Sequence, residues 1–132
     1  MTTGLQAFIQ HLFVVGGRAV SIPPPGALAE LAPPKAARAR AGDTFFVLLS
    51  PASGAHASAP LLEELARLAA DVYFGSGGGI TGGLREALSA VHTRASAGSV
   101  RLNALALVLR DDHLYAARAG TAFAALSQPG EL

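Results

Sequence analysis

The clearest hydrophobic pattern lies in the middle of the chain, where one apolar run precedes two segments of helical periodicity. Residues 44–49 are almost entirely apolar between two polar, turn-forming stretches, which predicts a buried strand. Leucine and alanine then recur every three to four positions over residues 58–74 and again over residues 81–96. Ser58 and Thr81 are predicted to cap these two helices, and the glycine-rich residues 75–79 separate them.

The last third of the chain has the alternating pattern of strands joined by tight turns. Residues 102–109 predict one strand, residues 110–112 a turn, residues 113–119 a second strand and residues 122–126 a third. Three leucines, at positions 105, 107 and 109, fall on one face of the first of these strands. We expect them to lie near Leu114 and to seal the two helices onto the sheet.

The first third is less regular. Residues 3–14 have apolar side chains at helical spacing and predict a short helix, although residues 12–15 are equally typical of the start of a strand. Residues 18–22 predict a short extended segment before a run of three prolines. Residues 23–42, rich in proline and alanine, predict either a long surface connection or an extended edge segment.

This order of elements predicts an α+β fold, a layered sheet with antiparallel pairing packed by a helical pair. Strands bracket the two helices instead of alternating singly with them, which argues against a doubly wound parallel sheet. With 132 residues the chain is expected to be a single domain. Residues 1–42 supply the helix and connection, and residues 43–132 supply the core.

Composition narrows the possible functions mainly by exclusion. The chain is 51% hydrophobic and 14% charged with a net charge of +1, so no overall field attracts nucleic acid or an anionic membrane. It contains no cysteine, which excludes disulfides, thiol chemistry and cysteine-based metal sites. The start lacks the basic residues of a signal peptide, and no apolar run approaches a membrane span. A cytoplasmic location is therefore expected, with no nucleic acid or membrane partner.

Two loops contain residue types that occur in active sites. Residues 75–83 form a glycine-rich tract, yet the Lys-Ser/Thr pair of a Walker loop is missing and a helix precedes it in place of a strand. Ser50, Ser53, His56 and Ser58 lie close in sequence, but no acidic residue is identified that would orient a base. An interhelical linker and a helix-capping loop are the favoured interpretations.

Other charged and metal-ligating residues predict solvated surface. The four histidines, His11, His56, His92 and His113, show no spacing typical of zinc ligands. The basic residues Lys35, Arg38 and Arg40 have no interleaved aromatic residues and predict a solvated loop. Converging carboxylates for a hard cation are not apparent, so no metal and no cofactor is expected.

Two segments are similar to motifs of the PPM-type, protein phosphatase 2C-like family of metal-dependent Ser/Thr phosphatases. Residues 46–54, Phe-Val-Leu-Leu-Ser-Pro-Ala-Ser-Gly, resemble the family strand that runs into Asp-Gly-Met-Gly-Gly. Residues 114–126, with Pro129-Gly-Glu-Leu after them, resemble the family hairpin that contains Val-Gly-Asp-Ser-Arg-Ala-Tyr. The resemblance covers residues 43–132 and implies the first half of the phosphatase α/β sandwich.

The matched positions lack the residues that the family chemistry needs. The bridging metal aspartate falls on Ser50 and its neighbouring glycine on Pro51, while Gly54 is kept. In the second motif Gly120 is kept, and the following aspartate becomes Thr121. Family catalysis requires carboxylates that hold two divalent ions. The resemblance therefore implies a degenerate, truncated member without catalytic residues.

The resulting hypothesis is a catalytically inactive phosphatase-2C-like domain that acts through protein–protein contacts, in a regulatory or scaffold role. A small enzyme that uses the loop from Ser50 to Ser58 is one alternative, and a structural self-associating module without phosphatase ancestry is another. A homodimer through the C-terminal sheet region is expected, because residues 122–126 would form an unpaired edge beside an uncovered apolar sheet face.

Overall fold

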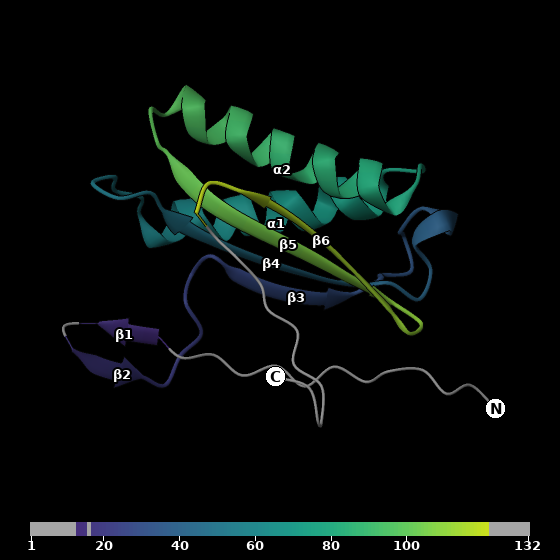
Figure 1. Ribbon diagram of the computed structural model, residues 1–132, viewed down its shortest axis with the longest axis horizontal. Coiled ribbons are helices and arrows are strands. Elements are labelled where there is room, and N and C mark those ends of the chain that lie inside the picture. Colours follow the sequence, from purple (N-terminus) through teal and green to yellow (C-terminus); the bar gives the residue numbers. More distant parts are fainter. Residues whose placement is uncertain (1–12, 16, 122–132) are drawn as a thin grey trace.

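The computed structural model describes residues 13–15 and 17–121, which contain a four-stranded antiparallel sheet packed against two helices (Figure 1). The sheet order is β3 (Ala27–Leu31), β4 (Thr44–Pro51), β5 (Leu102–Arg110) and β6 (His113–Ala119). Every neighbouring pair is antiparallel. The predicted α+β class and its antiparallel pairing are thus confirmed.

Both helices lie on the same face of this sheet (Figure 1). Helix α1 (Ala59–Gly75) packs over β3 and β4, and α2 (Ile80–Ala97) packs over β5 and β6. Ser58 caps α1 as predicted, because its Oγ accepts a hydrogen bond of 3.3 Å from the Leu61 N–H. Thr81 is wrong as the cap of α2, which begins at Ile80 after Gly79 without a side-chain cap.

The core lies between the helices and one face of the sheet. From the sheet it takes alternate residues of the two central strands, and from α1 an aromatic pair, Tyr73 and Phe74. The ring of Phe45 stacks on Tyr73 at 5.1 Å and meets the edge of Phe74 at 6.0 Å. The buried sheet residues are Phe45, Val47, Leu49, Ala104, Ala106 and Val108.

The prediction for the leucines of β5 is half right. Leu105, Leu107 and Leu109 do share a face, and Leu109 pairs with Leu114 across the β5–β6 ladder. That face is the one turned away from the helices, so these leucines do not seal the helices onto the sheet. Small residues occupy the helix side of β5, because a helix can approach a sheet closely only over short side chains.

The amino-terminal part differs from its predicted helix. Phe13–Val15 (β1) and Arg18–Val20 (β2) form a two-stranded antiparallel hairpin, with Gly17 at φ +79 in its turn. The predicted helix over residues 3–14 is therefore wrong at residues 13 and 14, where the alternative of a strand holds, and its remainder lies outside the described residues.

Residues 23–42 contain more structure than a connection. Strand β3 lies in this segment and forms an edge of the sheet, which agrees with the predicted alternative of an extended edge segment. A short 3-10 helix follows at Arg38–Arg40 (η1). The predicted third strand of the C-terminal meander, at residues 122–126, lies outside the described part of the chain.

Candidate functional site

The positions matched to the phosphatase motifs meet at one end of the sheet, where β4 ends, β5 begins and β6 ends. Ser50 and Asn103 are directly paired across β4 and β5. The side-chain Oδ1 of Asn103 accepts a hydrogen bond of 3.1 Å from the backbone N–H of Thr121. The sequence motifs, 70 positions apart, thus belong to one small region, whose side chains offer hydroxyl and amide groups.

The two glycines kept from the motifs have conformational reasons to be glycine. Gly54 lies at φ +79 and Gly120 at φ +82, in the left-handed region that residues with a Cβ rarely adopt. A Cβ on Gly120 would also collide with Oδ1 of Asn103, whereas one on Gly54 would meet nothing. These glycines, like Pro51 in the last position of β4, therefore shape the backbone and supply no chemistry.

The described part of the chain contains no set of residues that could hold a metal ion. Within it, no three residues of the types His, Cys, Asp and Glu lie close enough together to hold an ion. Ser50 is exposed at the end of β4 and offers one neutral oxygen, where a hard cation prefers carboxylates. The arrangement at this end can accept and donate ordinary hydrogen bonds.

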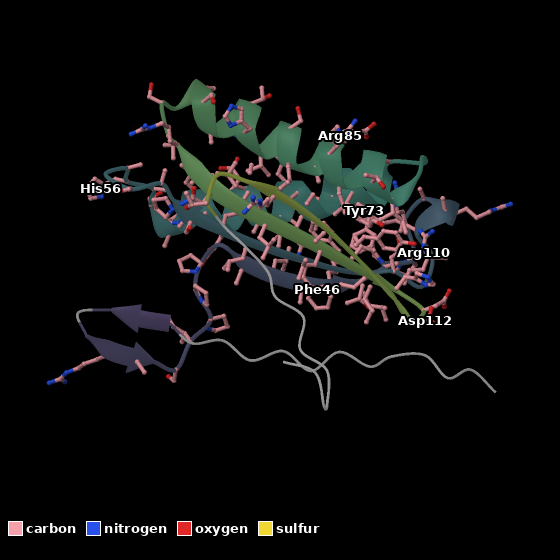
Figure 2. All side chains as sticks on the ribbon, in the orientation of Figure 1. Phe46, His56, Tyr73, Arg85, Arg110 and Asp112 are labelled. Carbon is pink, nitrogen blue, oxygen red and sulfur yellow. The ribbon has the colours of Figure 1, made fainter. Side chains whose placement is uncertain are left out.

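The loop from Ser50 to Ser58 does not assemble a nucleophile with a base. Ser50 lies in β4 on the face opposite to the helices, Ser53 and His56 are exposed, and the Ser58 hydroxyl caps α1. Figure 2 shows His56 at the tip of this loop, far from the labelled residues at the other end of the sheet. The favoured interpretation as a capping loop is confirmed for Ser58.

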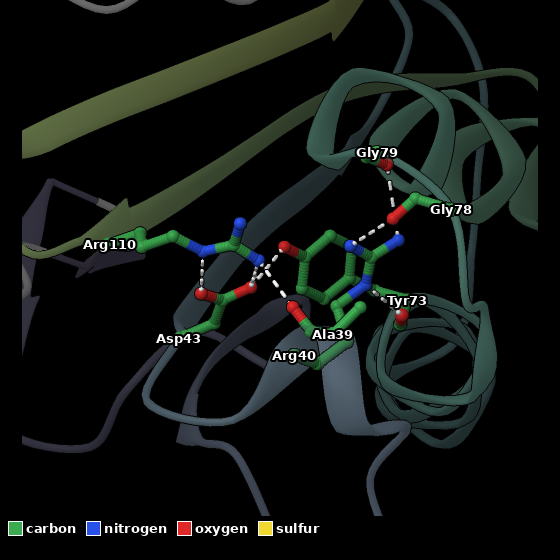
Figure 3. A network of polar contacts seen from close by, with 7 residues as sticks. All are labelled: Ala39, Arg40, Asp43, Tyr73, Gly78, Gly79 and Arg110. Atoms are coloured by element: carbon green, nitrogen blue, oxygen red, sulfur yellow. Dashed lines mark hydrogen bonds and ion pairs between the residues drawn. The ribbon is translucent and has the colours of Figure 1, made fainter.

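A buried polar network, which the sequence did not reveal, closes the opposite end of the sheet (Figure 3). Asp43 precedes β4 and is fully buried. It accepts hydrogen bonds from the Tyr73 hydroxyl at 2.6 Å and from Arg110 at 2.6 and 2.8 Å. Because the carboxylate is the shared acceptor, it joins β4, β5 and α1 at this end.

Arg40 forms the second half of the network. It is fully buried, so the predicted solvated loop is wrong at this residue. Its guanidinium lies 4.4 Å from the centre of the Tyr73 ring and donates to the carbonyl oxygens of Tyr73 (3.0 Å), Gly78 (2.8 Å) and Gly79 (3.2 Å). These contacts fasten η1 to the turn between the helices.

The same contacts explain the glycine-rich tract. Its carbonyl oxygens face a buried cation, which is the reverse of the N–H groups that an anion site presents. Gly83, in the first turn of α2, leaves space that Arg40 Nη2 occupies, because a Cβ there would collide with it. Residues 76–79 of the tract link the two helices, as predicted, and Gly83 is the glycine of the tract at which a Cβ would collide with Arg40.

The electrostatics of the network favour its present protonation states. Burial, followed by the hydrogen bond to Asp43, raises the pKa of Tyr73 well above its ordinary value. The hydrogen bond to Asp43 also raises the pKa of Arg110. Every buried side-chain nitrogen and oxygen among the described residues has a hydrogen-bond partner. The hydrogen-bonding groups of the network are therefore satisfied, and its contacts have a structural role.

Among the described residues, no helix packs on the face of the sheet that is turned away from α1 and α2. We call it the open face and define it by seven large apolar side chains: Leu31, Phe46, Leu48, Leu105, Leu107, Leu109 and Leu114. Leu31, Leu48 and Leu114 are 66%, 45% and 51% exposed. Figure 2 shows Phe46 on this side of the sheet, while Tyr73 lies between sheet and helices.

Comparison with known proteins found no similar protein. No family model matches the chain, and no curated protein and no solved structure is significantly similar to it. In the described part of the chain, neither helix has the combination of length and apolar character needed to cross a membrane.

Proposed function

We propose that this chain is a catalytically inactive domain, similar to the first half of the PPM-type phosphatase sandwich, that acts by binding protein through its open face. The observation that carries the proposal is the contrast within one sheet. One face is covered by two helices, and the other presents leucines and a phenylalanine with up to two thirds of a side chain exposed. An apolar patch of this kind is typical of an interaction surface.

The inactive character is supported by the residues at the end of the sheet. Ser50 and Thr121 stand where the resemblance implies aspartates, and Asn103 between them offers only a neutral amide. Catalysis through two bridged ions would require anionic ligands at these places. No contact in the Ser50–Ser58 loop favours the alternative of an unrelated enzyme.

An assay with Mn²⁺ and an aryl phosphate tests the inactive character. We expect no metal-dependent turnover and no Mn²⁺ binding by calorimetry. Ser50→Asp is the informative variant, because it adds one carboxylate and should still bind no ion without the partner ligands. Metal-dependent turnover that is lost in Ser50→Ala would contradict the proposal.

Photo-crosslinking in cells tests the contact surface. We would introduce p-benzoyl-phenylalanine at position 48 on the open face and, as the matched control, at position 89, where Ser89 is exposed on α2. The expected result is a protein adduct of discrete mass from position 48 and none from position 89. Absence of any adduct from position 48 would contradict binding through the open face.

A further inference from the structure

We infer that the partner of the open face is a second copy of this chain, which binds sheet against sheet in a symmetric dimer. The inference rests on the proposed function and specifies its partner. In such a dimer the two-fold axis lies in the plane between the sheets, so each copy contributes the same patch. The axis can run along the strands or across them. In both arrangements the central strands β4 and β5 of each copy lie at the middle of the contact.

The size of the face fits a partner as broad as itself. Strands of 5, 8, 9 and 7 residues, at about 3.4 Å per residue and a spacing of about 4.8 Å, give a flat footprint of roughly 470 Å². This flat estimate of about 470 Å² is smaller than the roughly 800 Å² of accessible surface that each partner buries in a standard interface, and the roughness of the side chains narrows the difference. A second sheet of equal dimensions covers the whole face.

The helix predicted for the amino-terminal residues is a poorer match. The helix predicted from the amino-terminal sequence is limited to residues 3–12, because Phe13 begins β1. Ten helical residues extend about 15 Å with a width of about 10 Å, so their footprint is roughly a third of the face. Leucines of both edge strands, Leu31 on β3 and Leu114 on β6, would remain in contact with water.

The chemical character of the open face also favours a second copy of the chain as its partner. Six leucines and one phenylalanine define it, and the register also places Arg118 on this face, opposite Leu105, so the complementary surface is mainly apolar. A net charge of +1 produces little repulsion between two copies. Sheets with the usual right-handed twist pack face to face at about −30° with interdigitated side chains, which suits a surface dominated by leucine.

Sedimentation equilibrium of the purified full chain tests this inference. We expect a dimer at micromolar concentration, and Leu48→Glu should raise its dissociation constant by at least roughly a hundredfold, because a carboxylate would be buried at the centre of the contact. Leu48 is 45% exposed, so the folded monomer should tolerate the charge. The matched control is Ser89→Glu, which adds the same charge to the exposed surface of α2 and should remain dimeric.

A second open-face variant keeps the test informative if Leu48→Glu unfolds. Leu114→Glu places the charge on a different strand at a residue 51% exposed, and circular dichroism shows which variants keep their fold. At least one folded variant is expected to be monomeric. A dimer that survives in every folded open-face variant would overturn the inference.

A cysteine probe then locates the contact. The chain has no cysteine, so Leu107→Cys creates a single thiol near the centre of the face. A short bis-maleimide should join two copies through position 107 and not through the control Ser89→Cys. Crosslinking through position 89 alone would overturn the inference.

The outcomes for the partner and for the proposed function can be told apart. A wild-type chain that is monomeric in the ultracentrifuge contradicts the homodimer. If that monomer still gives a discrete adduct with another protein at position 48 in cells, the proposed function stands with a different partner. If it gives no adduct, both proposals fail.

Discussion

The two faces of the four-stranded sheet are both largely apolar, and on β5 they are built from side chains of different size. On β5, Ala104, Ala106 and Val108 face the helices, while Leu105 and Leu107 face the other way. The short side chains allow α2 to pack closely, and the long ones form a raised surface. Alternation along a strand therefore defines two faces. Side-chain size separates them on β5 only, because β4 has large side chains on both faces: Phe45 and Leu49 toward the helices, Phe46 and Leu48 away from them.

The two faces also differ in their buried polar groups. On the helix side, Asp43, Tyr73 and Arg40 form a buried polar cluster that fixes the last turns of α1 to the sheet. On the open face no buried polar group is found among the described residues, and three of its seven defining side chains are largely exposed. The covered face is thus expected to provide the stability of the domain, and the open face its binding.

The largest effect is expected from Asp43→Ala, which removes the carboxylate that joins Tyr73 and Arg110. Because the Tyr73 hydroxyl would be left buried without its acceptor, the free energy of unfolding should fall by about 3–5 kcal/mol. Urea unfolding followed by circular dichroism measures it. Asp71→Ala, at an exposed carboxylate of α1 with only a 3.9 Å contact to Arg67, is the control and should change stability by less than about 0.5 kcal/mol. Equal effects of the two variants would show that the network does not hold the covered face.

A matched pair of Leu→Ala substitutions compares the faces directly. Leu65 of α1 is 0% exposed in the covered core, so Leu65→Ala should cost about 3 kcal/mol. Leu107→Ala deletes the same atoms from the half-buried open face and should cost about 1 kcal/mol in the monomer. The cost at Leu107 should rise with protein concentration if the face is buried in a dimer. Equal costs at low concentration would remove the distinction between the faces.

The sequence predicted the elements of the core better than it predicted their surroundings. Residues 44–49 form a continuous apolar run and residues 58–74 and 102–109 have strong periodicity, and the structure places β4, α1 and β5 there. The side of the sheet on which the helices lie was not predictable from Leu105 and Leu107, because alternation alone does not say which face is covered. Residues 13 and 14 followed the local pairing of β1 with β2 instead of their helical spacing.

The polar network was missed for a different reason. Its hydrogen bonds join residues separated by 30 to 71 positions, and no short motif marks Asp43, Tyr73 or Arg110. A buried arginine in a proline- and alanine-rich segment is indistinguishable by composition from a solvated one. The glycine tract was the available signal, since Gly83 accommodates Arg40, but its partner could not be named from the sequence.

The two glycines kept from the phosphatase motifs, Gly54 and Gly120, are expected to affect stability through their backbone conformation. Gly120→Ala should destabilise the fold by about 2 kcal/mol, because it adds the strain of a left-handed alanine to a collision with Asn103. Gly54→Ala carries the strain without the collision and should cost about 1 kcal/mol. Thermal unfolding of both variants measures the difference. A larger loss at Gly54 than at Gly120 would mean that the Asn103 contact does not support this end.

The smallest effect is a pH dependence that arises only on the covered face. Burial and the hydrogen bond to Asp43 hold the pKa of Tyr73 well above the ordinary value of 10.0 that it regains on unfolding. The stabilisation is therefore complete below about pH 10 and is lost as the pH rises, at up to about 1.4 kcal/mol per pH unit. Urea unfolding at pH 9, 10 and 11 should show this loss in the wild type and in Tyr115→Phe, which retains Tyr73. It should be absent in Tyr73→Phe, so a loss of the same slope in that variant would assign the alkaline sensitivity to groups outside the network.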